Sequence, residues 1–488
     1  MEPEIKESKE KNNFDETVKE GKEDIARKES SPPKPTAFTL FELFRNTIPC
    51  ANIDGTLHLF DSKENCYRPI DQKGLEHYLI QRYYSIAAQT GSLRIIKTCA
   101  ELIMHQELPE YHSAESAMRL CLQNGVLPLS DMEHTCFAAY DYTKFNPLAT
   151  FQIKANGLPN MSDWNAMKSL PTPWMDSFLN TSANGIPVIK DRIWEMIGYL
   201  LAPDQNGKCF FMLQGPPNSG KSLLGSFIQS LFPDYKIAAL DIDQLGKKNA
   251  TSLLINKCIN ISMDLPNKAL TPLAIRNIKL ITGNDDITVE HKNGTYERYH
   301  GNCKFLFATN HTLTLRGSDS GLEERLICIP FIRSISPQQR NYHLLDNLLL
   351  EKDYIVAKAL AYYRDLRNNN YVFSGSQYDL CKARIRYLPL DAEDIDASLC
   401  DFIETCCVFT SQDTGIHTED LYNAYRKYCK DNNTTPIDNQ PAFSRRMLRC
   451  YKDQIVKKKW RKNGARDPQW GFQGILFQPI QDIKVYNV

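Results

Sequence analysis

The stretch Cys209-Phe-Phe-Met-Leu213, followed by Gly215-Pro-Pro-Asn-Ser-Gly-Lys221-Ser222, decides the fold of this chain. The apolar run predicts a buried β-strand, and the second segment has the glycine and lysine spacing of a P-loop. In such a loop the backbone N–H groups turn toward phosphate oxygens. A helix is expected directly behind it, because Leu224, Phe227 and Ile228 follow at helical spacing. The helix N-terminus would add a favourable dipole to a phosphate site.

The P-loop motif predicts binding of a nucleoside triphosphate, with ATP and Mg²⁺ as the expected cofactors. Lys221 would reach the β- and γ-phosphates, and the Ser222 hydroxyl would ligate the metal ion. The alternative is a Gly/Pro turn that contains a lysine and a serine by chance, and the strand and helix on either side argue against it. The residues expected to hold the nucleotide are Gly215, Pro216, Pro217, Asn218, Ser219, Gly220, Lys221 and Ser222.

Length and composition are typical of a globular chain with several domains. The chain has 488 residues, of which 42% are hydrophobic and 24% are charged, and its formal net charge is zero. Attraction to nucleic acid must therefore come from local patches. The 15 cysteines show no metal-ligand spacing, and no apolar run is long enough for a membrane helix or a signal peptide. We expect a reduced chain in the host cell cytoplasm, with no membrane partner.

A second short strand with a terminal carboxylate follows downstream. Cys258-Ile-Asn-Ile-Ser-Met-Asp264 has the form of a Walker B strand, whose acid holds Mg²⁺ through water and polarises the attacking water. Apolar strands often end in aspartate, so the pattern is weak alone and gains weight from the P-loop upstream. Asp241 and Asp243 are alternative carboxylates, although loop or helix-capping roles suit them better.

Two further features lie between residues 287 and 310. Lys304-Phe-Leu-Phe-Ala-Thr-Asn310 is a strand that ends in an amide, which suits a sensor of the γ-phosphate, although an asparagine can also simply begin a turn. Asn293-Gly294, between two alternating runs, predicts a β-hairpin. The hairpin would either contact a phosphate backbone or be a solvated charged loop. Its candidate DNA contacts are His291, Lys292 and Arg298.

The order of these motifs resembles the superfamily 3 helicases, and within them the phage and plasmid primase-helicase family, which is related to the poxvirus primase-helicase. The resemblance includes Ile278-Lys-Leu-Ile-Thr-Gly-Asn-Asp285 and Gly317-Ser-Asp-Ser-Gly-Leu-Glu-Glu-Arg325 with the following Ile-Pro-Phe331. It implies that Lys221 and Ser222 bind phosphate and Mg²⁺. It also implies a Walker B role for Asp264 and a sensor role for Asn310.

The resemblance further implies that Arg325 is an arginine finger that acts in trans, because these ring helicases bind nucleotide between subunits. Glu324 stands where many relatives have another arginine. A hexameric ring that moves 3′ to 5′ on single-stranded and forked DNA is therefore implied. The segment before the helicase is too short for the primase domain of many relatives, so we expect a separate primase or polymerase.

Basic residues gather near the C-terminus, with tryptophans between them. A helix followed by a basic hairpin suits a winged-helix domain that contacts phosphates. The competing interpretation is a solvated charged face. The candidate contacts are Arg445, Arg446, Lys457, Lys458, Lys459 and Arg461.

These observations predict an α/β P-loop NTPase core, of the AAA+-like superfamily 3 type, with a mainly helical N-terminal domain and a C-terminal winged helix. The expected function is an ATP-dependent replicative DNA helicase of a phage, virus or mobile element. The alternative is an origin-binding initiator whose ATPase drives assembly or melting; a small-molecule kinase would leave Arg325 and the basic C-terminus unexplained. The predicted parts are a disordered charged tail (1–36), the helical domain (37–188), the helicase core (189–335), a helical connector (336–394) and the winged helix (395–488).

Overall fold

The computed structural model describes most of the chain after residue 34, and the predicted N-terminal tail lies almost entirely outside the described residues. The described residues are 35–478 without 84, 86–92, 133–136, 138–147, 159–162, 266, 291–293, 295, 383–384, 389–396, 411–413, 433 and 462–466. The chain forms two compact units. The first comprises residues 1–60 and 68–110, and the second comprises residues 61–67 and 111–488.

The first unit combines helices with a small sheet. Its helices share a core in which Phe44, Leu79 and Ile96 are almost fully buried. The sheet has the strand order β3-β2-β1-β4, and β1 pairs antiparallel with β2. In chain order the elements are α1 (Ala37–Thr47), β1 (Cys50–Ile53), β2 (Thr56–Asp61), β3 (Cys66–Pro69), α2 (Gln72–Arg82), α4 (Leu93–Met104) and β4 (Glu110–Tyr111).

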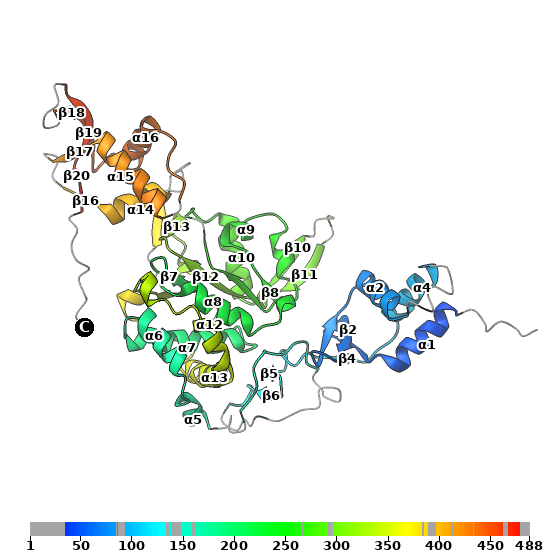
Figure 1. The fold of residues 1–488 in the computed structure, drawn as a ribbon. Coiled ribbons are helices and arrows are strands. Elements are labelled where there is room, and N and C mark those ends of the chain that lie inside the picture. Colours follow the sequence, from blue (N-terminus) through cyan, green and yellow to red (C-terminus); the bar gives the residue numbers. More distant parts are fainter. Residues whose placement is uncertain are drawn as a thin grey trace, which may run out of the picture. The chain divides into compact units, whose positions relative to one another are not determined.

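The second unit is built on a parallel sheet, which is consistent with an NTPase-like fold (Figure 1). In the described part of the chain this sheet has five strands in the order β14-β7-β12-β9-β8. Neighbouring strands all pair in parallel, so they end at one common edge of the sheet. The strands are β7 (Phe210–Gln214), β8 (Ile237–Ala238), β9 (Ile259–Ser262), β12 (Lys304–Thr309) and β14 (Leu326–Pro330).

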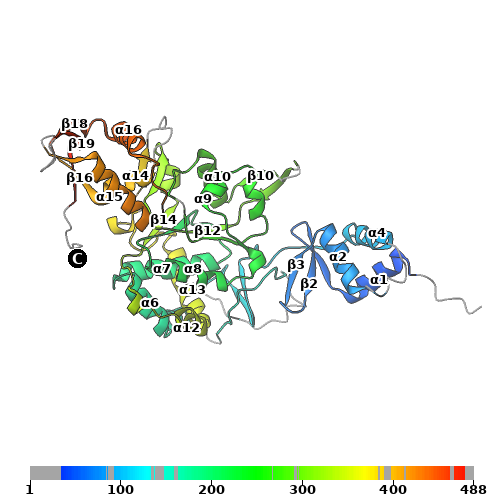
Figure 2. The same ribbon diagram turned by 45° about the horizontal axis from the view of Figure 1, so that its top comes forward.

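Helices cover both faces of this sheet (Figures 1 and 2). The alternation of side chains along β7 explains why. Phe211 and Leu213 belong to a core shared with the helices α7, α8 and α13. Phe210 and Met212 instead pack with residues of α9 and α10. The helices of this part are α5 (Trp164–Lys168), α6 (Pro173–Ser182), α7 (Pro187–Leu201), α8 (Lys221–Ser230), α9 (Ile242–Leu245), α10 (Pro272–Thr282), α11 (Ser320–Glu323), α12 (Leu344–Leu350) and α13 (Lys352–Asn368).

The helices α7 and α13 approach each other closely at Gly198. A Cβ atom at this position would lie 2.1 Å from the carbonyl oxygen of Ala359. The glycine therefore permits a contact between helix backbones that a larger residue would obstruct. The helix α7 begins at Pro187, and proline suits a first helical position because its missing N–H would have no helical partner there.

Smaller strand pairs accompany the sheet. The strands β10 (Asp286–Glu290) and β11 (Tyr296–His300) form the antiparallel hairpin predicted around Asn293-Gly294. β5 (Arg119–Leu122) pairs antiparallel with β6 (Gly125–Pro128). β13 (Leu313–Arg316) pairs parallel with β15 (Ile385–Leu388).

The C-terminal elements have their own core, in which Phe402, Tyr425 and Phe443 are buried. Within the described residues, helices precede a pair of antiparallel strands, β18 and β19, which is the order that the winged-helix prediction requires. The elements are α14 (Ala397–Cys406), β16 (Cys407–Phe409), β17 (Gly415–His417), α15 (Thr418–Asp431), α16 (Gln440–Tyr451), β18 (Val456–Trp460), β19 (Gln469–Gln473) and β20 (Ile475–Phe477).

The structure differs from the prediction in the N-terminal half. Residues 37–188 were expected to form one mainly helical domain, but the compact unit there ends at residue 110 and includes a sheet. Residues 111–188 belong instead to the unit that contains the P-loop motif. The reason is packing, because residues such as Leu127, Trp164 and Phe178 share the core of α7 and α13.

Candidate functional site

The P-loop motif connects the end of β7 to the start of α8, as the sequence predicts. Gly220 has a φ of +100° immediately before the helix, a backbone conformation that favours glycine. Asn218 also has a positive φ, of 60°. The segment that follows β14 holds the loop from the side, because the Ile335 backbone N–H donates to the Asn218 carbonyl at 2.9 Å. The loop is therefore a defined turn at a helix N-terminus.

The side chain of Lys221 folds back onto its own loop. Its Nζ atom donates to the carbonyl oxygens of Gly215 at 2.8 Å and Pro216 at 2.7 Å, and to Ser219 Oγ at 3.1 Å. Burial lowers the pKa of Lys221 to about 8, although the charge of Asp264 opposes this shift. The ammonium group is thus held by neutral acceptors only, so a phosphate group would be a stronger partner.

Asp264 and Asn310 lie at the same sheet edge as the P-loop motif. Asp264 follows β9 and Asn310 follows β12 directly. In the sheet, β12 lies between β7 and β9, and Thr309 is in register with Gln214 at the end of β7. Both side chains are exposed. The structure therefore brings the predicted Walker B acid and sensor residue to the P-loop.

The alternative carboxylates have other roles. The Asp241 side chain caps α9 by accepting a hydrogen bond from the Gln244 backbone N–H at 2.6 Å. Asp243 lies 3.8 Å from Lys268 Nζ. Asp241 therefore has the capping role that the sequence favours, whereas Asp243 lies within α9 itself.

One pocket of about 800 Å³ contains Lys221, Asp264 and Asn310. P-loop residues, Asp264 and Asn310 line one part of it, and α6 lines another through Trp174 and Phe178. The volume is typical of a site for a ligand of nucleotide size. Two lining residues, Arg333 and Arg340, were missed by the sequence reasoning. Their position just after β14, at the edge where the P-loop lies, is the signal that could have found them.

A magnesium ion would fit this pocket. Ser222, in the first turn of α8, and Asp264 both line it and both are exposed. Mg²⁺ bound with nucleotide usually takes one or two protein oxygens and completes its shell with phosphate oxygens and water. Among the described residues, no three His, Cys, Asp or Glu side chains cluster closely enough to hold a metal ion.

Arg325 lies at the opposite edge of the sheet. It directly precedes β14, and its carbonyl oxygen accepts a hydrogen bond of 2.8 Å from the N–H of Phe210, the first residue of β7. The P-loop begins after the last residue of that strand, four steps or roughly 13 Å farther along. The Arg325 guanidinium donates to the Gly321 carbonyl at 2.6 Å. It therefore stands away from the pocket of its own chain.

The predicted contacts of the β10–β11 hairpin are only partly described. His291 and Lys292 lie outside the described residues. Arg298 is exposed and hydrogen-bonds to Asp286 on the paired strand. Arg298 and then His300 lower the pKa of the Asp286 carboxyl group through hydrogen bonds. The charge of Arg298 is thus already matched within the hairpin.

The structure divides the predicted basic contacts of the C-terminal part between two elements. Arg445 is exposed on α16, where Arg446 is half-buried. Lys457 and Lys459 alternate with Lys458 along β18, so Lys458 points to the other face of the strand. Arg461 follows β18 and is exposed. The three lysines therefore do not form one surface.

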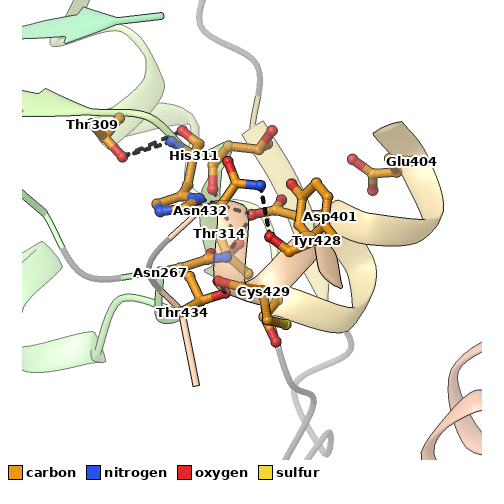
Figure 3. Close-up of polar contacts among 12 residues, drawn as sticks. Asn267, Thr309, His311, Thr314, Asp401, Glu404, Tyr428, Cys429, Asn432 and Thr434 are labelled. Carbon is orange, nitrogen blue, oxygen red and sulfur yellow. Dashed lines mark hydrogen bonds and ion pairs between the residues drawn. The ribbon is translucent and has the colours of Figure 1, made fainter. Parts of the chain in front are cut away.

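A buried polar junction joins the sheet edge to α14 (Figure 3). Asp401, which is 4% exposed, accepts a hydrogen bond of 2.5 Å from Asn267. Its carboxylate also lies 3.4 Å from the His311 ring. Arg386 of β15 donates to Asp401 at 2.5 Å and to Glu404 at 2.7 Å. Burial opposes charge on Arg386, but Glu404 and Asp401 outweigh it and raise the pKa of the guanidinium.

This junction contacts the two segments that carry the predicted catalytic residues. His311 is the residue after Asn310, and Asn267 lies three residues after Asp264. In Figure 3 the side chains of Asn267, His311 and Asp401 point toward one another. A change in either segment can therefore reach α14 through direct contacts.

Two family models match parts of the chain. Residues 213–325, which include the P-loop motif and Arg325, match a family of unknown function, DUF5906. Residues 397–475, which form the C-terminal domain, match the family described as Poxvirus D5 protein-like. The second match supports a relationship to the D5-like replication proteins.

The chain is also similar to solved structures of the NrS-1 C-terminal region. The A-form apo structure is 12% identical, with 90% of this chain and 99% of that chain covered and a TM-score of 0.41. A further apo structure of the same region gives the same identity, coverage and TM-score. In the described part of the chain, no helix has the length and apolar composition needed to span a bilayer.

Proposed function

We propose that this protein is an ATP-dependent replicative DNA helicase that works as a ring, most simply a hexamer, on single-stranded and forked DNA. One observation carries the proposal. Lys221, Asp264 and Asn310 share one pocket, whereas Arg325 lies at the far edge of the same sheet. Arg325 is thus too far from the pocket of its own chain. It would complete the pocket of a neighbouring copy of the chain instead.

The residues of the pocket have complementary roles toward ATP. Lys221 exchanges its backbone acceptors for the β- and γ-phosphates, while the N–H groups at the start of α8 donate to phosphate oxygens. Ser222 and Asp264 hold Mg²⁺, which when bound neutralises phosphate charge. Asp264 polarises the attacking water and Asn310 orients it. These groups bind and position the reactants before any neighbour takes part.

Arg325 of an adjacent subunit supplies the missing positive charge. An arginine that stabilises the transferring phosphoryl group in trans is worth about 10³–10⁵ in turnover rate. Hydrolysis therefore depends on assembly, and an isolated subunit is nearly inactive. The family resemblance adds 3′ to 5′ movement. A location in the host cell cytoplasm and a separate primase or polymerase as partner belong to the same proposal.

The proposal is tested by measuring ATP turnover, DNA unwinding and assembly on the same protein. We expect DNA-stimulated hydrolysis, displacement of one strand from a forked duplex, and a ring-sized particle with ATP and DNA. Hydrolysis without strand displacement would favour the origin-binding initiator instead. A monomer with full turnover would remove the trans role of Arg325, and with it the ring.

A further inference from the structure

The most unusual surface feature outside the nucleotide pocket is an exposed tryptophan on the β18–β19 hairpin. Trp470 is 51% exposed although it lies in the middle of a paired strand region. Two lysines of the neighbouring strand extend over its ring. The Nζ atom of Lys459 lies 4.9 Å from the ring centroid, and that of Lys457 lies 5.5 Å from it.

The strand register explains this grouping. Lys459 is directly opposite Trp470, and Lys457 is opposite Phe472, two residues along. Side chains two apart on a strand share a face, so these residues lie on one side of the hairpin. Phe472 is fully buried beneath. Among the described residues, no carboxylate lies within ion-pair distance of either lysine.

The other tryptophan of the hairpin is placed differently. Trp460 packs against the backbone of Gly471, where a Cβ atom would lie 2.1 Å from the indole ring. The ring of His417 covers it further, at a centroid distance of 4.6 Å. Trp460 is therefore part of the fold. Trp470 instead leaves about half of its surface in water, with two positive charges over its ring.

We propose that Trp470 stacks on an unpaired base of single-stranded DNA, while Lys457 and Lys459 contact the phosphates on either side. The choice of DNA as the partner rests on the proposed function. The occupant must have both a flat π-face and negative charges close to it, which a nucleotide strand has. A base inside a duplex is stacked on its neighbours, so only an unpaired base can offer its face.

The simpler interpretation is a cation–π pair that only stabilises the hairpin. Such exposed pairs contribute little to stability. Loss of the Trp470 ring would then change the unfolding temperature slightly and leave DNA binding alone. Measuring the DNA affinity of a Trp470 variant therefore distinguishes base stacking from a purely structural cation–π pair.

The test uses the full chain and a fluorescein-labelled oligothymidylate, with anisotropy titrations at several salt concentrations. Trp470→Leu is expected to weaken binding roughly tenfold without changing the salt dependence. Trp470→Phe keeps a stacking ring and is expected to restore most of the affinity. The double variant Lys457→Gln/Lys459→Gln is expected to reduce the slope of log affinity against log salt by about 1.4, or about 0.7 for each lysine.

The matched control is Phe477→Leu, because Phe477 is an exposed aromatic near the same hairpin, at 41% exposure, and no lysine of the described residues lies over its ring. Thermal unfolding of each variant confirms the fold. The proposal is overturned if Trp470→Leu binds the oligothymidylate as tightly as the wild type does, or if the substitution weakens binding to a blunt duplex as much as it weakens binding to the oligothymidylate.

The two proposals fail separately. ATP hydrolysis without oligothymidylate binding by the wild type would overturn the Trp470 assignment and leave the nucleotide site intact. Trp470-dependent binding without ATP hydrolysis would support the assignment and overturn the helicase.

Discussion

The Oδ2 atom of Asp401 lies 3.4 Å from the Nδ1 atom of His311, the residue next to the predicted sensor Asn310. Asp401 belongs to α14, at the start of the C-terminal domain, and is 4% exposed. A buried carboxylate with several partners is costly to leave incomplete. The contact therefore links the sheet edge that holds the predicted catalytic residues to the domain that carries the basic hairpin.

Asp401→Asn is expected to lower the free energy of unfolding by about 3 kcal/mol, because it leaves Arg386 buried with one fewer negative partner. Denaturant unfolding measures this. We also expect basal ATP turnover to survive while its stimulation by DNA is lost. The control is Glu404→Gln, which removes the half-exposed partner of the same arginine and should cost less than about 1 kcal/mol. Equal losses in the free energy of unfolding for Asp401→Asn and Glu404→Gln would contradict the special role of the buried Asp401 carboxylate.

Nucleotide affinity is expected to fall as pH rises above 8. The pKa of Lys221 is about 8 in the free protein, mainly because of burial, and bound phosphates would raise it. Binding above pH 8 therefore requires proton uptake, which weakens it by up to about tenfold per pH unit. Below pH 7 the lysine is already charged, so Lys221 adds no further pH dependence there.

The measurement is a titration with ADP across this pH range. Lys221→Arg is the control, because arginine stays charged throughout. Its affinity is expected to be lower but independent of pH. A wild-type affinity that does not change between pH 7 and 9 would mean that Lys221 does not contact the phosphates.

Gly198→Ala is expected to lower the free energy of unfolding by about 1–3 kcal/mol, through overpacking between α7 and α13. The added Cβ atom would meet the Ala359 carbonyl oxygen at 2.1 Å. Gly321→Ala is the control, because the nearest atom to its Cβ position is 3.5 Å away. That variant should be neutral or slightly stabilising, since alanine favours a helix. Chemical denaturation measures both values, and equal free energies of unfolding for the two variants would contradict overpacking at Gly198.

Much of the candidate site could be predicted because its signals are local. The strand before Gly215, the αL glycine at 220 and the hairpin around Asn293-Gly294 each depend on residues adjacent in sequence. The parallel order of the sheet then brings Asp264 and Asn310 to the P-loop without any further information. Local chemistry and strand topology therefore suffice for this part of the site.

The remaining features depend on tertiary packing. Arg333 and Arg340 line the pocket, and only the order of the strands in the sheet shows that the segment after β14 reaches the P-loop motif. The contact of Asp401 with His311 joins residues far apart in the chain. The short strands of the first unit, such as Cys50–Ile53, carry too few residues to show a period. The boundary near residue 110 follows from which helices share a core.

Arg325→Ala is expected to reduce ATP turnover by at least about 10³-fold while nucleotide binding is unchanged. The reason is geometric, because Arg325 stands beside Phe210 at the edge of the sheet opposite the P-loop. Mixing Arg325→Ala with Lys221→Ala protein should restore partial turnover. In a mixed ring, the intact P-loop of one variant meets the intact arginine of the other. Glu324→Ala, a change at the exposed neighbouring residue, is the control and should keep full turnover. If mixing restored nothing while both variants still assembled with the wild type, Arg325 would have a structural role within its own subunit.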